Sequence, residues 1–451
     1  MVEISFAGGR DIEGPTTWAQ EEVWRGIRPD RPNDGYANVR FAIPVRPGTG
    51  VSDIAAVVER IMAVHEGLRT TFPTTGAAKL DVQRVHSSGV IDVPAVELGE
   101  RAVEAFAEDW GQRSFDTRAE WPARFAIALS DGIPTALVVA VSHLVADKYG
   151  ESALVSDLRA LLSGQDVWTG ADRVTAVGRG AEEATDRLKA ISHRALARWE
   201  DVLGSDDLVT FGAARSDTDV WRRASLLSPQ ATIAAEEIAA RVKVSSAGVF
   251  MAATGVLAAT LSSRASVAMA SLLSNRFSES EAAFVGSLVQ PWGLVLDVGS
   301  RSFPDIVRAT YGASLRSYRM GRYDRYDVEA LRSELRERKG LAAPPWFDVL
   351  HNDSRSARAR ATVSRGTGER VATRLPDLHR FGLGYSLFVE VRDVGEWADI
   401  TVFVNSRFVS PSDPLALAAA VEQLLIRVAG GADGPAAAVM AAALDERGGD
   451  R

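Results

Sequence analysis

The sequence predicts an α/β fold with α+β layers, divided into two lobes. The chain has 451 residues, and a single hydrophobic core stops growing near about 250 to 300 residues. In the first half, a segment with helical spacing at 53–68 precedes the apolar run 135–141. In the second half, an alanine-rich helical segment at 246–261 precedes a strand-like run at 266–273. A helix followed by a strand in each half favours two related lobes.

The first-half elements follow from the spacing of apolar residues. The helix at 53–68 carries them at helical spacing, at Ile54, Val57, Val58, Ile61, Met62 and Val64. Clustered threonines and Pro73 after this segment predict an exit into a strand. The run Thr135–Val141 is short and rich in β-branched residues, as in a strand buried on both faces. Apolar residues recur at helical spacing over 154–162, so residues 143–150 form a connection between a strand and a helix. Catalytic and binding residues are often found in such loops.

The division between the lobes is predicted from a change in composition. Residues 163–183 are polar, contain glycine and lack a dense apolar face, which is typical of a linker. We therefore expect one lobe over residues 1–170 and another over 171–451. In the second lobe, a further helix ends near 199–203, and a last helix covers 415–428. The Gly/Ala/Asp-rich tail at 430–451 is predicted to be frayed.

Composition narrows the possible functions. Hydrophobic residues at 46% and charged residues at 24% are typical of a soluble globular protein. Cysteine is absent, which excludes thiol nucleophiles, disulfides and thiolate metal sites. The net charge of −8 argues against nucleic-acid binding. No apolar run reaches the roughly 18 residues of a membrane span, and the first residues lack a secretory signal, so we expect a cytoplasmic protein without membrane contact.

Several well-known catalytic motifs are missing. The six histidines include no pair at the spacing of a helical metal site, so we expect no bound metal. There is no phosphate-binding G-x-x-x-x-G-K-[ST] loop, no G-x-G-x-x-G after a strand and no G-x-S-x-G nucleophile elbow. Small acyl substrates and protein partners are the classes that remain.

The connection at 142–150 carries a motif that resembles a known family. Its sequence, SHLVADKYG, is similar to the HHxxxDG signature of nonribosomal peptide synthetase condensation domains and related acyltransferases. His143 matches the second histidine and Asp147 the aspartate, whereas Ser142 and Lys148 replace the first histidine and the glycine.

Flanking segments in the same order strengthen the resemblance. HEGLRTTF at 65–72 is similar to the H-E-x-L-R-T-x-F segment of the family almost letter for letter. TWAQEEVW at 17–24 resembles the opening S-x-A-Q-x-x-x-W segment, and Asn275-Arg276 followed by VGSLVQ at 285–290 resembles N-R…I-G-x-F-V-N. Weaker similarities lie at 115–124, 344–349 and 405–408. The matches span most of the chain.

The resemblance implies two chloramphenicol-acetyltransferase-like lobes that form a V-shaped pseudo-dimer with a central tunnel. It implies a free-standing condensation enzyme that transfers an acyl group from a carrier-protein thioester to an amine or hydroxyl, in nonribosomal peptide, antibiotic or related natural-product biosynthesis. No cofactor is expected to be bound, and the phosphopantetheine arm of an acyl or peptidyl carrier protein serves as substrate tether. Because the sequence holds no G-G-[HD]-S carrier motif, the carrier is expected in trans, with a small amine or alcohol acceptor and a monomeric enzyme.

The resemblance also assigns the site residues. His143 either takes a proton from the attacking group or hydrogen-bonds it into line; the alternative is a core histidine that ends a strand. Ser142 supports the loop, and Asp147 is structural, with Arg69 as the candidate salt-bridge partner. The side chain of Lys148 points outward or contacts a phosphopantetheine phosphate or an acidic substrate. Residues expected beside the tunnel are Lys148, Tyr149, Gly150, Asn275, Arg276 and Gln290.

The sequence leaves two alternative functions possible, and it allows two interpretations of one basic stretch. The same motif suits a catalytically silent recruitment domain, or a stand-alone O-acyltransferase acting on a lipid or polyketide alcohol. The basic stretch at 316–339 suits an acidic carrier protein, or is a solvated helix face with interleaved glutamates.

Overall fold

The structure, a computed structural model, divides into two compact units. It describes residues 1–9, 11–27, 34–73, 79–99, 101–167, 173–208, 211–212, 214–215, 219–318, 321–355, 368–378 and 384–448. The first unit comprises Met1–Ile191 and Ser274–Gln290, and the second comprises Ser192–Leu273 and Pro291–Arg451. We call Ser274–Gln290 the returning segment, because the chain comes back to the first unit there.

This division differs from the predicted boundary after residue 170. Part of the predicted linker is a helix, α5 (Ala176–Glu183), which packs on strand β2 (Ile12–Pro15) of the first unit. Its Glu183 is buried and accepts a 2.7 Å hydrogen bond from the backbone N–H of Trp18. This part of the sequence looks like a polar linker because two of the four buried positions of α5, Arg179 and Glu183, are charged residues with specific partners.

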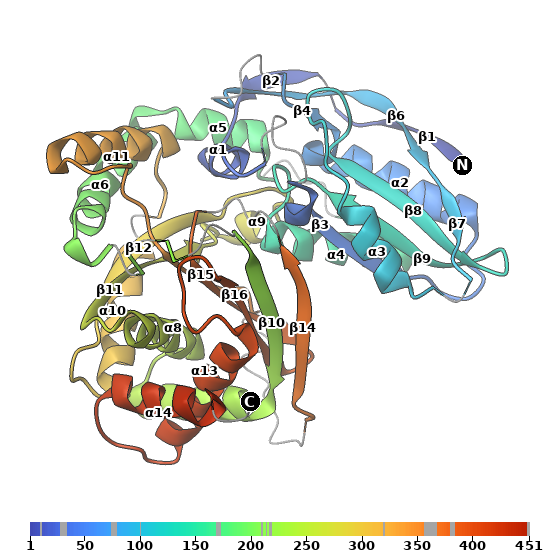
Figure 1. Cartoon of the computed structure of the whole chain (residues 1–451). Coiled ribbons are helices and arrows are strands. Elements are labelled where there is room, and N and C mark those ends of the chain that lie inside the picture. Colours follow the sequence, from blue (N-terminus) through green and yellow to red (C-terminus); the bar gives the residue numbers. More distant parts are fainter. Residues whose placement is uncertain are drawn as a thin grey trace. The chain divides into compact units, whose positions relative to one another are not determined.

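The first unit has three small sheets among its described residues, in the orders β1-β6, β2-β5-β4 and β3-β9-β8-β7 (Figure 1). The strands other than β2 are β1 (Val2–Ala7), β3 (Val39–Pro44), β4 (Thr70–Thr71), β5 (Val82–Val85), β6 (Ser88–Val93), β7 (Ala95–Glu97), β8 (Ala123–Ser130) and β9 (Ile133–Val141). The helices are α1 (Trp18–Trp24), η1 (Asp34–Ala37), α2 (Val51–Val64), η2 (Glu66–Arg69), α3 (Val103–Gly111), α4 (Lys148–Leu162), α5 and α9 (Glu279–Ala282). Helix α6 (Asp186–Leu203) begins in this unit and continues into the second.

Strand β9 is buried on both faces, as its sequence predicts. Leu137, Val139 and Val141 face a core that includes α2 and α4. Ala136 and Val138 face the other side, where they meet α3. Successive side chains of a strand point to opposite faces, so a run of apolar residues without alternation needs cover on both. The strand ends at Val141, directly before the predicted motif.

Among its described residues, the second unit is built on one seven-stranded sheet of order β12-β11-β13-β15-β16-β10-β14. The strands are β10 (Trp221–Ser228), β11 (Ser266–Leu273), β12 (Gln290–Asp297), β13 (Val349–Asp353), β14 (Val371–Leu378), β15 (Leu387–Val394) and β16 (Trp397–Asn405). The helices are η3 (Asp206–Leu208), α7 (Pro229–Val242), α8 (Ser246–Ser262), α10 (Phe303–Tyr318), α11 (Arg325–Lys339), α13 (Pro414–Ala429) and α14 (Ala436–Gly448). One core joins α7, α8, α10, α13 and α14 to the sheet, and another joins α6 and α11 to it.

Most of the predicted second-half elements are confirmed: the helices near 199–203, 246–261 and 415–428 are α6, α8 and α13, and the strand at 266–273 is β11. The predicted frayed tail is wrong, because residues 436–448 form α14. Ala436, Met440 and Ala443 of this helix are buried in the core. Their spacing of three to four residues places them on one helical face. Alanine is small, so this apolar face is easily missed in the sequence.

Within the described residues, no single helix has the length and hydropathy of a membrane span. Helices α7 and α8 pass that test only as a pair, bent by 105° at their junction. Both contribute to the core of the second unit.

Candidate active site

The candidate site is built on the loop Ser142–Asp147, which joins β9 to α4. The backbone N–H of Ser142 donates to the carbonyl of Pro122, at 2.8 Å, and the N–H of Val145 donates to the carbonyl of Ser142, at 3.0 Å. The apolar residues at 144–146 are buried in the core. These contacts fix the loop on both sides of His143, whose side chain is only half-buried.

One ring nitrogen of His143 is fixed by the loop itself. Its Nδ1 lies 2.8 Å from the carbonyl oxygen of Ala146. A carbonyl oxygen only accepts hydrogen bonds, so Nδ1 carries the proton and donates it. In the neutral ring, Nε2 then carries the lone pair, and it makes no hydrogen bond with the part of the chain that the structure describes. The arrangement leaves a basic nitrogen on a partly exposed ring.

Ser142, which replaces the first histidine of the motif, lies against the backbone of the loop. It is 1% exposed, and its Oγ lies 3.4 Å from the backbone N–H of Leu144. Its side chain thus contacts the loop backbone and leaves His143 as the histidine of the motif.

Asp147 caps helix α4 and links it to the returning segment. One carboxylate oxygen accepts from the N–H of Gly150 at 2.8 Å. The other accepts from the N–H groups of Leu288 and Val289, at 2.8 and 3.1 Å. The residue is 1% exposed, so these hydrogen bonds satisfy a buried charge. The structural assignment of Asp147 agrees with this geometry.

The salt-bridge partner of Asp147 is Arg276, and the predicted pairing with Arg69 is wrong. Arg276 Nη1 lies 2.8 Å from Asp147 Oδ2, and both side chains are at most 4% exposed. Arg276 also donates through Nη2 to the carbonyl of Gly286, at 2.9 Å. Arg69 instead donates to the carbonyl of His86, at 2.5 Å. The partner comes from 129 residues further along the chain, a pairing that local spacing does not reveal.

A second contact between the loop and the returning segment was not singled out from the sequence. The buried Ser287 donates its hydroxyl to the carbonyl oxygen of His143, at 2.5 Å. Ser287 lies within the VGSLVQ similarity, and that motif is the sequence signal for it. With the Asp147–Arg276 pair, this hydrogen bond holds the backbone on both sides of the candidate catalytic ring.

Gly150 allows helix α4 to approach the returning segment closely. A Cβ atom at Gly150 would lie 2.8 Å from the carbonyl oxygen of Gly286 and 3.0 Å from its nitrogen. These distances leave no room for a side chain. The family motif has a glycine at the position of Lys148, which would allow another backbone segment to approach closely. In this chain the glycine that permits such an approach is Gly150, two residues later.

Lys148 lies at the first position of α4, and its side chain is 52% exposed. Its Nζ pairs with Glu151 Oε1 of the same helix, at 2.8 Å. This geometry favours the outward orientation among the two that the sequence left open.

The remaining predicted residues support the returning segment. Arg276 lies over the ring of Tyr149, with 5.4 Å from its Cζ to the ring centre. Asn275 has a left-handed backbone, with φ of 53°, and its Nδ2 donates to the carbonyl of Leu288 at 3.0 Å and to Gln290 Oε1 at 3.3 Å. The structure thus brings all the predicted tunnel residues into the first unit around Asp147. That they line a substrate tunnel stays a prediction.

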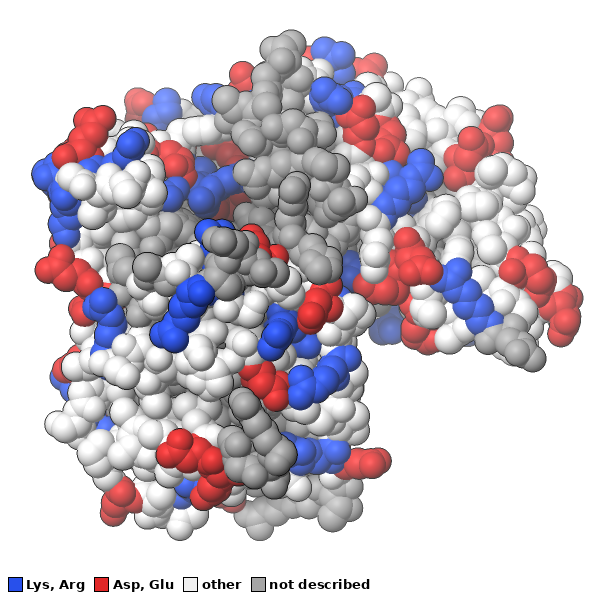
Figure 2. All heavy atoms as spheres, in the orientation of Figure 1, with Lys and Arg blue, Asp and Glu red and all other residues white. Residues whose placement is uncertain are grey.

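Within the described residues, several cations of the basic stretch at 316–339 pair with neighbouring acids, while Arg319 lies outside those residues. Arg332 of α11 is buried and pairs with Glu329, at 2.5 Å. Arg338 pairs with Glu200 and Glu334, at 2.6 and 3.2 Å. On the face shown in Figure 2, basic and acidic side chains are interspersed. These pairs favour the solvated helix face over a carrier-binding patch.

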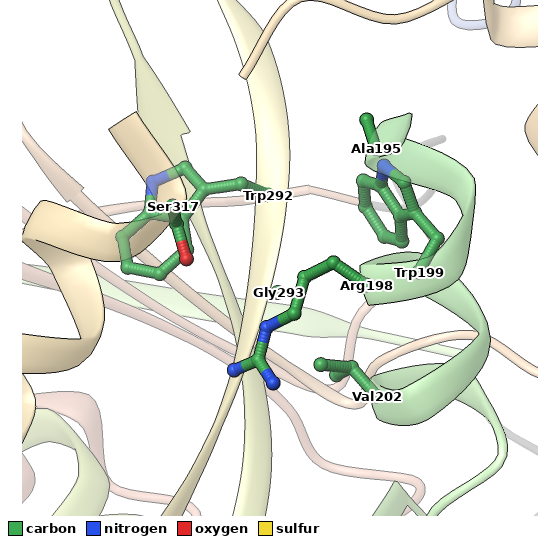
Figure 3. Close-up of a pocket in the computed structure, with 7 residues that line it drawn as sticks. All are labelled: Ala195, Arg198, Trp199, Val202, Trp292, Gly293 and Ser317. Carbon is green, nitrogen blue, oxygen red and sulfur yellow. The ribbon is translucent and has the colours of Figure 1, made fainter. Parts of the chain in front are cut away.

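The described residues of the second unit have a small pocket between α6 and β12. Figure 3 shows Trp199 and Arg198 of α6 beside Trp292 and Gly293 of β12, with Ser317 of α10. Its volume is about 10 Å³, close to the space that one water molecule needs. Among the described residues there is no group of three His, Asp or Glu side chains placed to hold a metal ion.

Comparisons with known proteins show which folds this chain resembles. No family model matches the chain. The isonitrile lipopeptide synthase of Mycobacterium tuberculosis is 25% identical over 375 residues, which are 76% of this chain and 14% of that protein. The chain therefore covers a small part of the length of this relative.

Two solved structures resemble the chain over nearly its whole length. The condensation domain of the monacolin K polyketide synthase MokA has a TM-score of 0.75 at 17% identity, covering 95% of this chain and 99% of that one. The X-domain from teicoplanin biosynthesis has a TM-score of 0.71 at 16% identity, covering 94% and 97%, and is also known in a complex with OxyB. The chain has the mixed helix and sheet fold of condensation domains, and the resemblance predicted from its motifs is confirmed.

Proposed function

We propose that the chain is a condensation-type acyltransferase in which His143 acts on the attacking amine or hydroxyl. The observation that carries the proposal is the hydrogen bond from Nδ1 to the Ala146 carbonyl, which leaves the lone pair on Nε2 of a partly exposed ring. The condensation-domain fold and the similarity to an isonitrile lipopeptide synthase support a condensation-type function.

In the proposed reaction, the acyl donor is a thioester on the phosphopantetheine arm of a carrier protein supplied in trans. The attacking N–H or O–H gives its proton to Nε2, or hydrogen-bonds to it, while the nucleophile adds to the acyl carbon. The tetrahedral intermediate then expels the thiolate, which takes up a proton as the C–S bond breaks. The products are an amide or ester and the free thiol, so no bound cofactor is needed.

The surrounding residues act by position. The Ala146 carbonyl fixes the tautomer of His143, and Ser287 holds the backbone of the same residue. The Asp147–Arg276 pair ties the loop to the returning segment. An orientation fixed before the reaction lowers the entropy cost of bringing the nucleophile into line.

The test uses the chain alone with acyl-loaded carrier proteins and a panel of amines and alcohols, including lipid and polyketide alcohols, read by intact mass. We expect a mass increase on one acceptor class with the wild type and none with His143→Ala. The matched control is His193→Ala, because the His193 side chain is 70% exposed and lies on α6. Undiminished transfer by folded His143→Ala contradicts the proposal.

The second candidate is a recruitment domain without catalysis. It is favoured by Ser142 at the first histidine position and by the similarity to the X-domain, for which a complex with OxyB is known. In that case no acceptor gains mass with the wild type, and a partner protein binds equally to wild type and His143→Ala in a pull-down. Transfer that depends on His143 contradicts this candidate.

A further inference from the structure

The first unit contains a cavity of about 390 Å³ that the proposed reaction does not use. All its lining residues belong to the first unit. They come from the end of β1 and the two residues after it, from the end of α2, from η2, from the start of α5 with the three residues before it, and from the returning segment. Its volume lies within the range of small-molecule sites, about 300 to 1,000 Å³. The charged residues that line it are Arg60, Glu66, Arg69 and Arg173.

Arg69 is a buried cation in the wall, and it makes no ion pair with the described residues. The residue is 3% exposed, and its Nη1 donates a hydrogen bond to the carbonyl oxygen of His86. Its Nε is buried without a hydrogen-bond partner, and neither Nε nor Nη2 bonds to any residue that the structure describes. Burial is the main influence on its pKa and lowers it, while the more distant Glu66 and Asp11 raise it. A buried charge without a close counter-ion is costly.

The Nε–Nη2 edge of a guanidinium matches two oxygens of a carboxylate or phosphate. In Arg69 this edge lacks a protein acceptor among the described residues, while the other side of the group is held by His86. The arginine is therefore fixed in place with its bidentate edge unused.

Among the other charged groups that line the cavity, the cations outnumber the one acid, Glu66, which opposes an anion. Arg173 and Arg60 contribute two further cations, paired with Asp157 at 3.3 Å and with Asp166 at 2.9 Å. Burial lowers the pKa of His65, although its hydrogen bond to Asp157 opposes this, so the ring adds no charge near neutral pH. Helix α5 begins at this cavity after its N-cap Thr175, and its first turn has no acidic residue. A helix N-terminus favours negative charge.

We propose that this cavity binds an oxyanion, the carboxylate or phosphate group of a small molecule, at the Nη2 end of the Nε–Nη2 edge of Arg69. The proposal stands apart from the acyl-transfer proposal, because neither His143 nor Asp147 lines the cavity.

The test is isothermal titration calorimetry of the full chain with inorganic phosphate and, separately, with acetate, at constant ionic strength set by chloride. We expect saturable binding of one anion per chain, and the tighter of the two probes identifies the source as phosphate or carboxylate. Arg69→Met is expected to weaken binding at least about tenfold, the loss of one charge-assisted bidentate contact.

Arg60→Gln is a second variant that tests the proposal if Arg69→Met fails to fold. Its side chain is 41% exposed, and it is expected to weaken binding about threefold by removing one nearby positive charge. The matched control is Arg84→Gln, a 51% exposed arginine paired with Glu13 outside the cavity, which should leave the affinity unchanged. Absence of saturable binding for both anions overturns the proposal. Wild-type affinity in Arg69→Met, or equal affinity in Arg60→Gln and Arg84→Gln, overturns it as well.

Discussion

His143 of the first unit and His351 of the second are bonded alike but placed differently. Nδ1 of His143 donates to the Ala146 carbonyl at 2.8 Å, and Nδ1 of His351 lies 2.9 Å from Thr254 Oγ1. The Thr254 hydroxyl donates to the carbonyl of Phe250, at 3.1 Å, so it accepts from His351. In both rings Nε2 carries the lone pair. His143 follows a strand and is half-buried, whereas His351 lies within β13 and is 0% exposed.

The difference shows that exposure decides what the same tautomer can do. The lone pair of His143 can meet a substrate, because its ring lies in a loop at the end of a strand. The Nε2 atom of His351 is buried without a hydrogen-bond partner among the described residues. Burial is the main cause that lowers the pKa of His351 to about 4. The negative charge of Asp353 opposes this shift, and the positive charge of Arg355 adds a smaller lowering of the pKa. The first ring is suited to chemistry, and the second makes the fold sensitive to acid.

The largest expected effect concerns the support of the His143 loop. Asp147→Asn should lower the free energy of unfolding by about 3 to 5 kcal/mol, because it leaves the buried Arg276 without its counter-charge. Urea unfolding followed by circular dichroism measures this change. The control is Asp166→Asn, which breaks an exposed pair with Arg60 and should change the stability far less, because exposed ion pairs contribute little. Equal stability of the two variants would mean that the loop does not depend on the buried pair.

The next effect concerns His351 and acid. The unfolded chain takes up a proton at this ring near pH 6.5, whereas the folded protein does so only near pH 4. The stability that the neutral ring gives is complete above about pH 6.5 and falls by about 3 kcal/mol as the pH drops to 4.

Urea unfolding at several pH values measures this loss in the wild type and in His351→Leu. We expect a flatter pH dependence in the variant, although His65, whose pKa burial also lowers, keeps part of the acid sensitivity in both. Parallel pH curves for the two proteins would contradict the assignment to His351.

A smaller effect is expected at Ser287. Ser287→Ala removes the hydroxyl that donates to the His143 carbonyl and should cost about 1 kcal/mol of stability. Because the hydroxyl positions the loop that carries the ring, kcat for acyl transfer should fall while KM stays the same. The control is Ser152→Ala, whose hydroxyl donates to the Lys148 carbonyl on the exposed side of α4. A rise in KM alone would instead indicate substrate contact by Ser287.

The smallest effect is expected at Lys148. Lys148→Gln removes an exposed pair with Glu151, so stability should change by about 0.5 kcal/mol or less and the kinetics should be unchanged. Steady-state kinetics with a carrier-bound donor provide the measurement. A raised KM for that donor would show that the lysine contacts the phosphopantetheine phosphate or an acidic substrate.

The elements that the sequence predicted best have a regular pattern that burial requires. Strand β9 and helix α8 are mostly apolar because each is enclosed by other elements, and the spacing in α2 follows its buried face. Helix α14 was missed because its buried face is largely alanine. The sequence predicts a linker where helix α5 lies, because the buried residues of this helix include the charged Arg179 and Glu183.

For the candidate site, the residues could be predicted from the sequence, but only part of their pairing could. The motif identified His143, Asp147, Asn275 and Arg276, and the structure brings the loop and the returning segment together. The predicted salt bridge between Arg69 and Asp147 is wrong because the sequence shows only that Asp147 needs a buried arginine, and more than one arginine meets that condition. Only the tertiary contact distinguishes Arg276, which binds Asp147, from Arg69, which lines a cavity.

The most direct test of the central claim is the single-turnover rate of acyl transfer by His143→Ala and by His351→Leu, at saturating donor and near pH 7. We predict that His143→Ala lowers the rate by about 10²- to 10⁴-fold, the usual contribution of a general base. His351→Leu, folded at the same pH, should transfer at close to the wild-type rate. Equal rates for wild type and folded His143→Ala would contradict the assignment of His143 to the reaction.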